Sequence, residues 1–285
     1  MKKKAFVIIQ YLLPKHWLSR LMHAFARTRW RWLKNLTIDV FLRNYQVNMQ
    51  EAAEPDPHAY ESFNAFFTRT LHPSARPIAT ETGALVSPVD GTISQIGIIN
   101  DDAIIQAKGH YYSLLALMAG DAALAQRYRG GHFACIYLAP FNYHRIHMPL
   151  SGTLSNTIYV PGALFSVNTT TAQSVPNLFA RNERVICDFH STSAAFAMVL
   201  VGALFVGSIE TVWAGEINPP PRYKQIVEID KGRGLSLEKG AEAGRFNMGS
   251  TVVLLVEPGR MQWNNHLQSG DVVKLGQHLG TLLTA

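Results

Sequence analysis

The sequence predicts an α+β fold, in which N-terminal amphipathic helices precede a mostly β body of two packed sheets with a barrel-sandwich-like C-terminal part. Between Pro14 and Trp32, apolar residues recur at helical spacing. From Leu85 onward, short runs rich in Val, Ile, Leu, Thr and Tyr alternate with Gly, Pro and Asn, as in β-rich domains. Glycines separate brief strands between Ser269 and Gly280, a pattern also seen in biotinyl and lipoyl carrier domains.

The first predicted element is a basic amphipathic helix, whose apolar residues include Trp17, Leu18, Leu21, Met22 and Phe25. Residues 1–45 carry ten Lys and Arg against one acid, Asp39, whereas the remaining residues carry 16 basic and 19 acidic groups. The net charge of +6 therefore belongs to the N-terminus, which argues against nucleic-acid binding by the whole protein. Two interpretations stay open: the helix lies in the interface of an anionic membrane, or it packs on its own domain. The basic excess favours the membrane.

A polar, proline-punctuated segment from Glu51 to Pro57 separates the helices from the body. We assign residues 1–50 to basic amphipathic membrane-binding helices and residues 51–285 to a catalytic domain. Within that domain, the spacing of apolar residues predicts a helix from Ser62 to Leu71 and a helical hairpin or pair between Tyr112 and Tyr128.

The N-terminus resembles a signal peptide only in part, because Gln10 and Pro14 interrupt the apolar run and no small-x-small cleavage site follows. The longest apolar stretch, residues 194–207, has 14 residues, which is short for a membrane-spanning helix. Neither secretion nor a transmembrane segment is predicted. Cys135 and Cys187 lie in strand-like apolar runs, which predicts buried free thiols and no disulfide framework.

Reactive side chains concentrate in three segments: Ser87-Pro-Val-Asp90-Gly, Pro140-Phe-Asn-Tyr-His144-Arg-Ile-His147-Met-Pro and Met-Gly249-Ser250-Thr. Together they offer an acid, a base and a hydroxyl. A serine becomes a nucleophile when a base takes its proton, and a carboxylate can fix the tautomer of that base.

Each segment also has a structural interpretation. Asp90 suits a turn, Ser250 can simply open a strand, and the two histidines lack the further ligands of a metal site, so no metal is expected.

Taken in order, these segments resemble those of bacterial phosphatidylserine decarboxylases. The resemblance covers most of residues 60–257 and includes Phe63-Asn-Ala-Phe-Phe-Thr-Arg, Tyr143-His-Arg-Ile-His-Met-Pro, Pro161-Gly-Ala-Leu-Phe-Ser-Val-Asn, Asn182-Glu-Arg-Val, and Val201-Gly-Ala through Val206-Gly-Ser-Ile-Glu. The family element Leu-Gly-Ser-Thr carries Met248 in place of Leu. This change preserves apolar volume and leaves the Gly-Ser bond intact.

The resemblance implies that Ser250 is both the cleavage residue and the precursor of a pyruvoyl group, with His147 as base and Asp90 as its orienting partner. Ser250 Oγ would attack the carbonyl of Gly249 and convert the peptide to an ester. Elimination then releases the upstream chain, and hydrolysis leaves the pyruvoyl group and ammonia. The expected products, residues 1–249 and the 36 residues 250–285, form a heterodimer, and a homo-oligomer of that heterodimer is possible.

The implied reaction converts phosphatidylserine to phosphatidylethanolamine in phospholipid biosynthesis. The pyruvoyl carbonyl forms a Schiff base with the substrate amine and accepts electrons as carbon dioxide leaves. His144 is the expected proton donor to the product, although His147 stays open for that step. Phe165 and Ser166 are expected to line the headgroup pocket, with core packing as the alternative for Phe165.

Because the diacyl tail of the lipid stays in the bilayer, we expect peripheral attachment to the cytoplasmic face of the bacterial inner membrane. Two other functions stay open. One is a serine peptidase or esterase acting on an external substrate, against which the lack of a Gly-x-Ser-x-Gly elbow argues. The other is a non-catalytic membrane-binding module with a carrier-like β fold. A lipoylation site is not expected, because Lys274 lies inside a predicted strand-turn unit instead of at an exposed hairpin tip.

Overall fold

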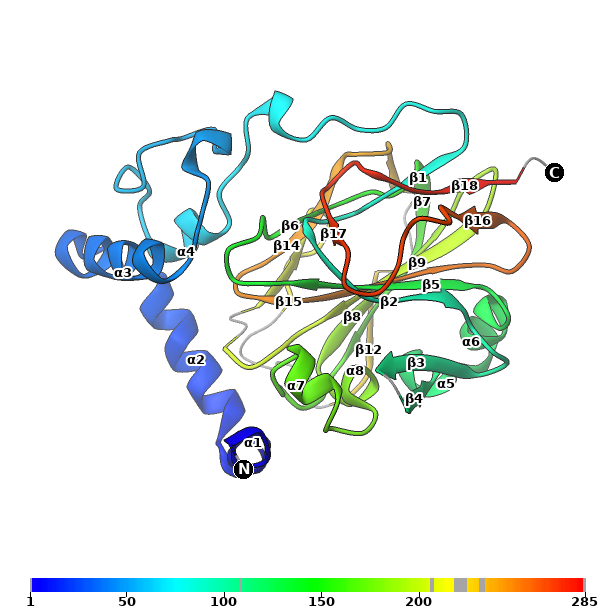
Figure 1. The fold of residues 1–285 in the computed structure, drawn as a ribbon, viewed down its shortest axis with the longest axis horizontal. Helices are drawn as coiled ribbons and strands as arrows, with labels where there is room; N and C mark the ends of the chain where they lie inside the picture. The colour runs from blue at the N-terminus through cyan, green and yellow to red at the C-terminus, as the bar shows by residue number, and fades with distance from the viewer. Residues whose placement is uncertain (1, 108, 206–207, 218–224, 231–233, 284–285) are drawn as a thin grey trace.

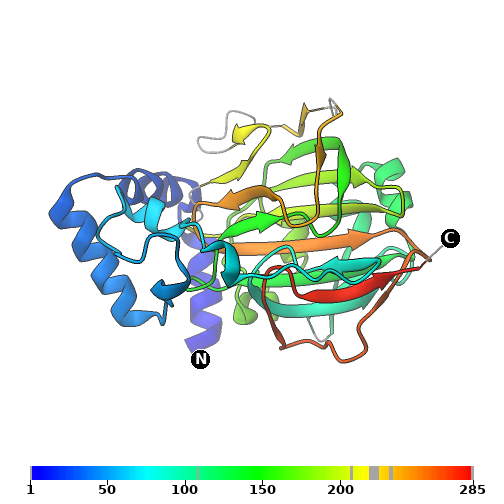
Figure 2. The same cartoon turned by 90° about the horizontal axis from the view of Figure 1, so that it is seen from above.

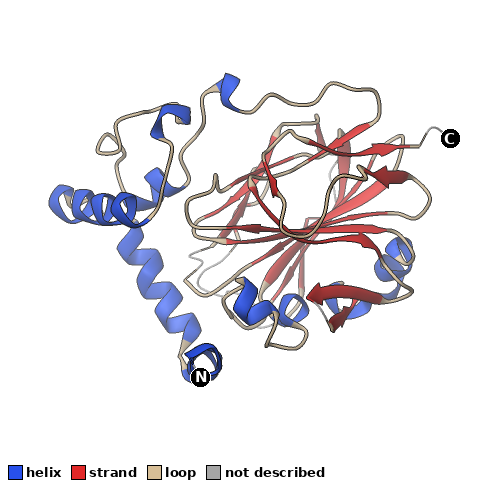
Figure 3. Ribbon diagram, viewed as in Figure 1, coloured by secondary structure: helices blue, strands red, loops and turns tan. Residues whose placement is uncertain are grey.

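A computed structural model describes the chain except residues 1, 108, 206–207, 218–224, 231–233 and 284–285. N-terminal helices lie to one side of a β body, which confirms the predicted α+β class (Figure 1, Figure 3). The helices are α1 (Lys2–Leu12), α2 (Lys15–Ala26), α3 (Arg31–Asn44), η1 (Met49–Glu51), α4 (Phe63–Phe67), η2 (Pro73–Ala75), α5 (Leu114–Leu117), α6 (Ala122–Tyr128), α7 (Thr169–Ala172) and α8 (Leu178–Arg181).

The strands are β1 (Ala84–Val86), β2 (Gly91–Ile98), β3 (Ala103–Ala107), β4 (His110–Ser113), β5 (His132–Leu138), β6 (Arg145–His147), β7 (Gly152–Val160), β8 (Arg184–His190), β9 (Ala195–Val201), β10 (Ile209–Thr211), β11 (Gly215–Glu216), β12 (Val227–Asp230), β13 (Ser236–Leu237), β14 (Glu242–Phe246), β15 (Ser250–Val256), β16 (Met261–Trp263), β17 (Val272–Val273) and β18 (His278–Leu282).

The predicted amphipathic helix is two helices, because α2 ends at Ala26 and the chain turns before α3 begins at Arg31. Ala26 and Ile38 face inward and pack with aromatic side chains of α4. Large apolar side chains are nevertheless exposed along all three N-terminal helices: Phe6, Ile8, Ile9, Tyr11, Leu12, Trp17, Leu21, Phe25, Trp32, Leu36 and Val40. Among the described helices, none has the length and apolarity needed to cross a bilayer.

The predicted helix from Ser62 to Leu71 is shorter in the structure, where α4 spans only Phe63–Phe67. Ser62 caps its start by accepting a hydrogen bond from the Ala65 N–H at 3.1 Å. The helix stops at Thr68, whose carbonyl accepts a hydrogen bond from Arg145 Nε at 2.9 Å. This contact draws the end of α4 onto the start of β6. The pair predicted between Tyr112 and Tyr128 is present as α5 and α6.

A nine-stranded sheet forms the centre of the body, in the order β12-β7-β8-β9-β15-β5-β2-β17, with β13 also paired to β7. Strand β15 lies inside this sheet. It pairs antiparallel with β5 from Ser250↔Leu138 to Val256↔His132, and antiparallel with β9 on its other side. Every residue of β15 is buried, which explains why its sequence is an uninterrupted apolar run after Thr251.

Both faces of this sheet are covered, and successive side chains of β15 point to opposite faces. Val252 and Leu254 belong to a core shared with β1, β6, β14 and β18, whereas Val253 and Leu255 belong to a core shared with α5 to α8. In Figure 1 the small helices lie below the large sheet and the small sheets above it. His147 belongs to the upper layer, in β6.

Two small sheets form that upper layer, one in the order β11-β10-β14-β6 and the other in the order β1-β18-β16. The body thus divides into more sheets than the two that we predicted, since β3 and β4 form a further two-stranded sheet. Turns with positive φ at Gly270 (φ +100°) and Gly276 (φ +81°) flank β17, in agreement with the glycine-separated strands predicted near the C-terminus. Seen from above, the C-terminal strands run beside the chain that leads from α4 into the body (Figure 2).

The two cysteines are free and buried, Cys135 in β5 and Cys187 in β8, as predicted. Burial raises the pKa of both thiols, so they remain protonated and packed in the sheet.

Candidate active site

The Gly249-Ser250 bond lies where the chain crosses from one sheet to another. Strand β14 ends at Phe246 in a small sheet, and β15 begins at Ser250 in the large one. The connection is held at Asn247, whose side-chain amide donates to Ser208 Oγ at 2.5 Å and whose Oδ1 accepts from Asn64 at 3.1 Å. The segment that leads to Ser250 is therefore held on one side by the β body, through Ser208, and on the other by helix α4, through Asn64.

Ser250 is fully buried, and its Oγ forms no hydrogen bond with any described residue. Side chains two residues apart in a strand point to the same face. Ser250 therefore faces the same way as Val252 and Leu254, toward the layer that contains β6 and β14. A buried hydroxyl without a partner costs free energy, and such groups concentrate where a reaction or a ligand requires them.

His144 is the imidazole beside this bond. A Cβ atom added to Gly249 would lie 3.7 Å from His144 Nε2. The Nδ1–H donates to the carbonyl of Asn142 at 2.8 Å, which leaves Nε2 as the nitrogen with a free lone pair, and Nε2 has no partner among the described residues. The Phe67 ring packs on the imidazole with centroids 4.1 Å apart.

The protonation state of His144 follows from this burial. Burial, together with the nearby charge of Arg69, lowers the pKa of His144 to about 3, although the hydrogen bond to the Asn142 carbonyl acts in the opposite direction. The isolated protein therefore holds His144 neutral at physiological pH. A neutral imidazole with a free Nε2 is a proton acceptor.

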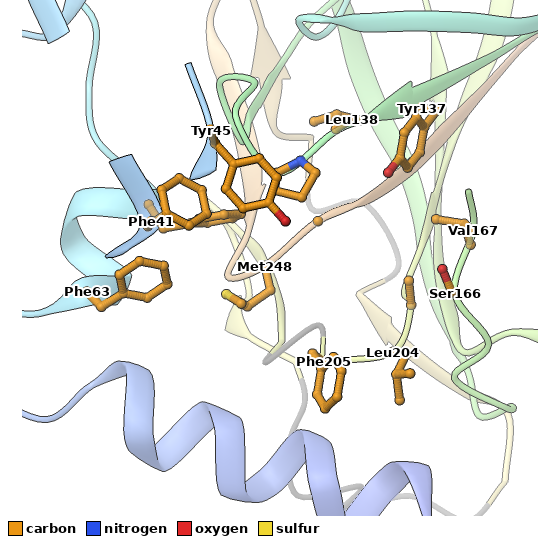
Figure 4. A pocket seen from close by; sticks show the side chains of 14 residues that line it. Phe41, Tyr45, Phe63, Tyr137, Leu138, Ser166, Val167, Leu204, Phe205 and Met248 are labelled. Carbon is orange, nitrogen blue, oxygen red and sulfur yellow. The ribbon is translucent and has the colours of Figure 1, made fainter. Parts of the chain in front are cut away.

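A mostly apolar cavity of about 310 Å³ opens beside Gly249. Figure 4 shows Phe41, Tyr45 and Phe63 on one side of it, Ser166 and Val167 on the other, and Met248 between them. The cavity is thus formed between helices α3 and α4 and the β body. Met248, which precedes Gly249, forms part of its wall.

His147 lies further along the same segment and has different contacts. Its Nδ1 is 2.8 Å from the carbonyl of Gly240, and its Nε2 is 3.1 Å from the hydroxyl of Tyr143. Burial lowers the pKa of His147, whereas the Gly240 carbonyl and the charges of Glu242 and Asp90 raise it. Neither nitrogen is hydrogen-bonded to Ser250 or to Asp90 in this arrangement.

Asp90 is buried and bound to an arginine. Its two oxygens accept from Arg76 Nε at 2.9 and 3.0 Å, and Oδ2 also accepts from Arg76 Nη2 at 2.6 Å. Oδ1 accepts from the main-chain N–H of Leu275 at 2.8 Å. The predicted orienting partner of His147 therefore acts on that imidazole through its charge, not through a direct hydrogen bond.

The two residues predicted to line a headgroup pocket have different positions. Ser166 lines the cavity beside Gly249. Phe165 belongs to the core and packs against Tyr11 of α1 with ring centroids 4.9 Å apart, beneath Lys15 Nζ at 4.1 Å. Its aromatic ring thus joins the N-terminal helices to the body, in line with the packing alternative.

Sequence reasoning missed the contribution of α3 to the cavity wall. Phe41 in α3 and Tyr45 just after its end are four residues apart, and their ring centroids lie 4.7 Å apart. This spacing is visible in the sequence, but it did not show which surface the two rings would cover. Arg76, the partner of Asp90, had no sequence signal at all. No group of three or more His, Cys, Asp or Glu side chains among the described residues is arranged to hold a metal ion.

A buried serine at a Gly-Ser junction, next to a neutral imidazole and an apolar cavity, defines a site for chemistry at that peptide bond. Comparison with known proteins gives the family. The phosphatidylserine decarboxylase family matches residues 63–281, and a second family description, PSD, matches residues 5–46. The chain therefore belongs to the phosphatidylserine decarboxylase family.

The chain is also similar to relatives of this family over nearly its full length. The chain is 54% identical over 282 residues to a phosphatidylserine decarboxylase proenzyme of Pseudomonas fluorescens, with 98% of both chains covered. It is 52% identical over 287 residues to the proenzyme of the same name from Pseudomonas putida strain W619, with 100% of both chains covered. The corresponding protein of Ectopseudomonas mendocina is 51% identical, with 98% of this chain and 99% of the relative covered.

Proposed function

We propose that this protein cleaves itself between Gly249 and Ser250 and then decarboxylates phosphatidylserine to phosphatidylethanolamine. The observation that carries the proposal is the buried, unpartnered Oγ of Ser250 at a Gly-Ser bond beside His144. Family membership and the proenzyme names of the relatives support both the reaction and the processing.

For cleavage, we propose the roles that the family resemblance implies. Ser250 Oγ attacks the Gly249 carbonyl, His147 takes its proton, and Asp90 stabilises the imidazolium that forms. In support, the charge of Asp90 favours the protonated form of His147. To reach Oγ, His147 Nε2 exchanges its contact with Tyr143 for Ser250. Active-site hydrogen bonds often form only in the reacting state.

The surroundings of Ser250 fit the pyruvoyl group that cleavage of this bond would leave. The group would replace a side chain that makes no hydrogen bond, at a position bordered by His144 and by the apolar cavity. When formed, a pyruvoyl group supplies an electrophilic carbonyl that accepts an electron pair as carbon dioxide leaves.

For decarboxylation, we propose that His144 moves the proton. Its Nδ1–H is fixed on the Asn142 carbonyl, so Nε2 faces the reacting atoms as a base. Nε2 takes a proton from the substrate ammonium and returns it to the α-carbon that has lost carbon dioxide. The apolar cavity favours this reaction, because a carboxylate in apolar surroundings is less stable than the uncharged carbon dioxide. Ser166, like Tyr45 and Tyr137, is a hydroxyl-bearing residue of the cavity wall, and we propose that it contacts the headgroup.

The two chains produced by cleavage are expected to stay together. The shorter chain begins with β15, which is hydrogen-bonded on both edges to strands of the longer chain, β5 and β9. Strand β15 is also packed on both faces, so its release would unfold the large sheet. A heterodimer of the two chains follows from this arrangement, and its assembly into a homo-oligomer stays a prediction.

We propose that α1, α2 and α3 hold the site at an anionic membrane, peripherally on the cytoplasmic face of the inner membrane. The exposed apolar side chains of these helices support this location, as does the excess of basic residues in the first 45 positions. Helix α3 lines the cavity and also carries exposed Trp32, so a lipid substrate entering beside α3 stays close to the bilayer. The division into a membrane-binding segment, 1–50, and a catalytic domain, 51–285, belongs to this proposal.

Intact mass spectrometry with a carbon dioxide assay tests the function. Wild-type protein is expected to yield the 36-residue C-terminal chain and to release carbon dioxide from phosphatidylserine, whereas Ser250→Ala stays at the full 31.7 kDa and releases none. Thr251→Val is the matched control, because it removes the neighbouring buried hydroxyl. Normal cleavage of Ser250→Ala, or an uncleaved wild-type protein with no activity, would refute the proposal.

A further inference from the structure

A second cavity, of about 150 Å³, is lined in part by the segment that leads to His144. Leu138 and Pro140 line the cavity beside Gly249, whereas the next residues, Phe141 to Tyr143, line the second one. The second cavity is also lined by three cations and two carboxylates: Arg69, Arg76, Lys274, Glu51 and Asp90. Its wall therefore carries a net positive charge.

Arg69 is the cation in this wall without a partner. The residue is 5% exposed, no described residue accepts a hydrogen bond from its guanidinium group, and its Nε is buried. Its guanidinium group lies over the Phe66 ring, with Cζ 5.7 Å from the ring centroid. Asp90 and Glu51 are close enough for their charges to act on Arg69, but both are hydrogen-bonded to Arg76.

Arg184 shows what a satisfied buried arginine looks like in this protein. It is 2% exposed, and its guanidinium group donates to the carbonyls of Leu117, Ala116, Ala180 and Asn182 at 2.7 to 3.1 Å. Burying a guanidinium group without such acceptors costs several kcal/mol. An acceptor that enters the cavity would offset this cost for Arg69, and an anion of suitable size is the acceptor that an arginine fork binds best.

Arg69 also lies close to the reaction centre. It follows Phe67, which packs on His144, and Thr68, which is hydrogen-bonded to Arg145. Its charge acts on His144 and contributes to the lowered pKa of that imidazole. An anion bound to Arg69 would offset this charge and raise the proton affinity of His144.

We propose that Arg69 binds the phosphodiester of the substrate headgroup, an inference that rests on the proposed function of this same site. The headgroup offers two anions, a carboxylate and a phosphodiester. An arginine on the carboxylate would stabilise the substrate more than the transition state, because that charge is lost as carbon dioxide leaves. The phosphodiester keeps its charge throughout the reaction and lies only a few bonds from the reacting amine. Asn142 and Tyr143 add polar groups to the same wall.

Steady-state kinetics on phosphatidylserine in mixed micelles test the inference. Arg69→Gln should raise KM at least about tenfold with a smaller change in kcat, since it removes a charge-assisted contact made to substrate and transition state alike. Inorganic phosphate should inhibit the wild-type enzyme competitively and lose this effect in Arg69→Gln. Arg129→Gln, a half-exposed arginine that pairs with Asp101 at 3.3 Å, is the matched control and should behave as wild type.

Unchanged KM in Arg69→Gln, or phosphate inhibition equal to that of the wild type, would overturn the inference. If Arg69→Gln does not fold, Arg69→Lys provides the test, because lysine keeps the positive charge but lacks the two-pronged guanidinium group. We expect Arg69→Lys to raise KM and to weaken inhibition by phosphate. Wild-type values for both quantities would overturn the inference. Calorimetric titration of uncleaved Ser250→Ala protein with inorganic phosphate separates this inference from the proposed function. Binding that Arg69→Gln abolishes would support the anion site even if no decarboxylation were found.

Discussion

Asp90 and Arg76 form a buried ion pair in which three hydrogen bonds of 2.6 to 3.0 Å join the carboxylate to the guanidinium group. Both side chains are 8% exposed. The same carboxylate accepts the main-chain N–H of Leu275, which lies C-terminal to the proposed cleavage site. Asp90 thus links the two chains that cleavage would produce, in addition to the role proposed for it beside His147.

Replacing Asp90 by Asn should therefore destabilise the fold as well as impair cleavage. In the uncleaved Ser250→Ala background, we expect Asp90→Asn to lower the free energy of unfolding by about 3 kcal/mol, because Arg76 loses a buried partner. Urea denaturation measures this change. Glu61→Gln removes an exposed ion pair with Arg29 and should cost about 1 kcal/mol or less. An equal effect of the two substitutions would contradict a structural role for Asp90.

The two histidines should separate cleavage from decarboxylation. His147→Ala is expected to leave the precursor uncleaved in mass spectra, because it removes the proposed base. His144→Ala is expected to cleave but to release carbon dioxide at least about a hundredfold more slowly, because it removes the proposed proton carrier. His266→Ala, at an exposed histidine, should match the wild type in both assays. An uncleaved His144→Ala precursor would instead assign the base to His144, the imidazole beside Gly249.

The burial of His144 predicts a dependence of stability on pH. Its pKa is lowered to about 3 in the folded protein from 6.5, so between these values the unfolded chain binds a proton that the folded chain does not. Stability is then complete above pH 6.5 and falls as the pH is lowered, by at most about 1.4 kcal/mol per pH unit from this group. Urea midpoints of Ser250→Ala protein at pH 7 and pH 5 measure the fall.

Adding His144→Gln to that background should reduce the difference between the two midpoints, because the titrating group is removed. Adding His266→Gln should leave the difference as it was. If His144→Gln and His266→Gln gave the same difference, the acid sensitivity would have another source.

Membrane attachment should depend on the exposed apolar side chains of α2. Trp17 is 61% exposed, and burial of such a side chain in the interface contributes about 2 kcal/mol, so Trp17→Asp should weaken binding to phosphatidylglycerol vesicles at least about tenfold. Co-sedimentation measures the binding. Tyr111→Asp, at a 56% exposed aromatic on β4 of the body, is the control and should bind like the wild type. Equal loss in both variants would argue against α2 as the membrane contact.

Much of this protein could be predicted from local patterns in the sequence. The helical spacing after Pro14 predicted amphipathic helices, and the fully apolar run after Thr251 predicted a strand of the β body, because side-chain periodicity is set by the geometry of each element. The order of the three reactive segments identified the family, which the comparisons confirmed. These are properties of short stretches of chain.

Contacts between distant residues could not be predicted in this way. Sequence reasoning placed Asp90 with His147 and gave no role to Arg76, whereas the structure joins Asp90 to Arg76 and Leu275. Phe165 and Ser166 are neighbours in the chain, yet one packs under the N-terminal helices and the other lines the cavity. Neighbouring side chains point in different directions, and what they meet depends on how the layers stack.

At Gly249-Ser250, the sequence by itself determined the residue types that the proposed reaction needs: a hydroxyl, a glycine carbonyl and nearby bases. Only the tertiary structure decided that Ser250 Oγ is buried without a partner, that His144 is the imidazole beside this bond, and that α3 and α4 form the cavity wall. The physical reason is that residue chemistry is local, whereas burial, charge and reach arise when strands and helices from the whole chain pack together.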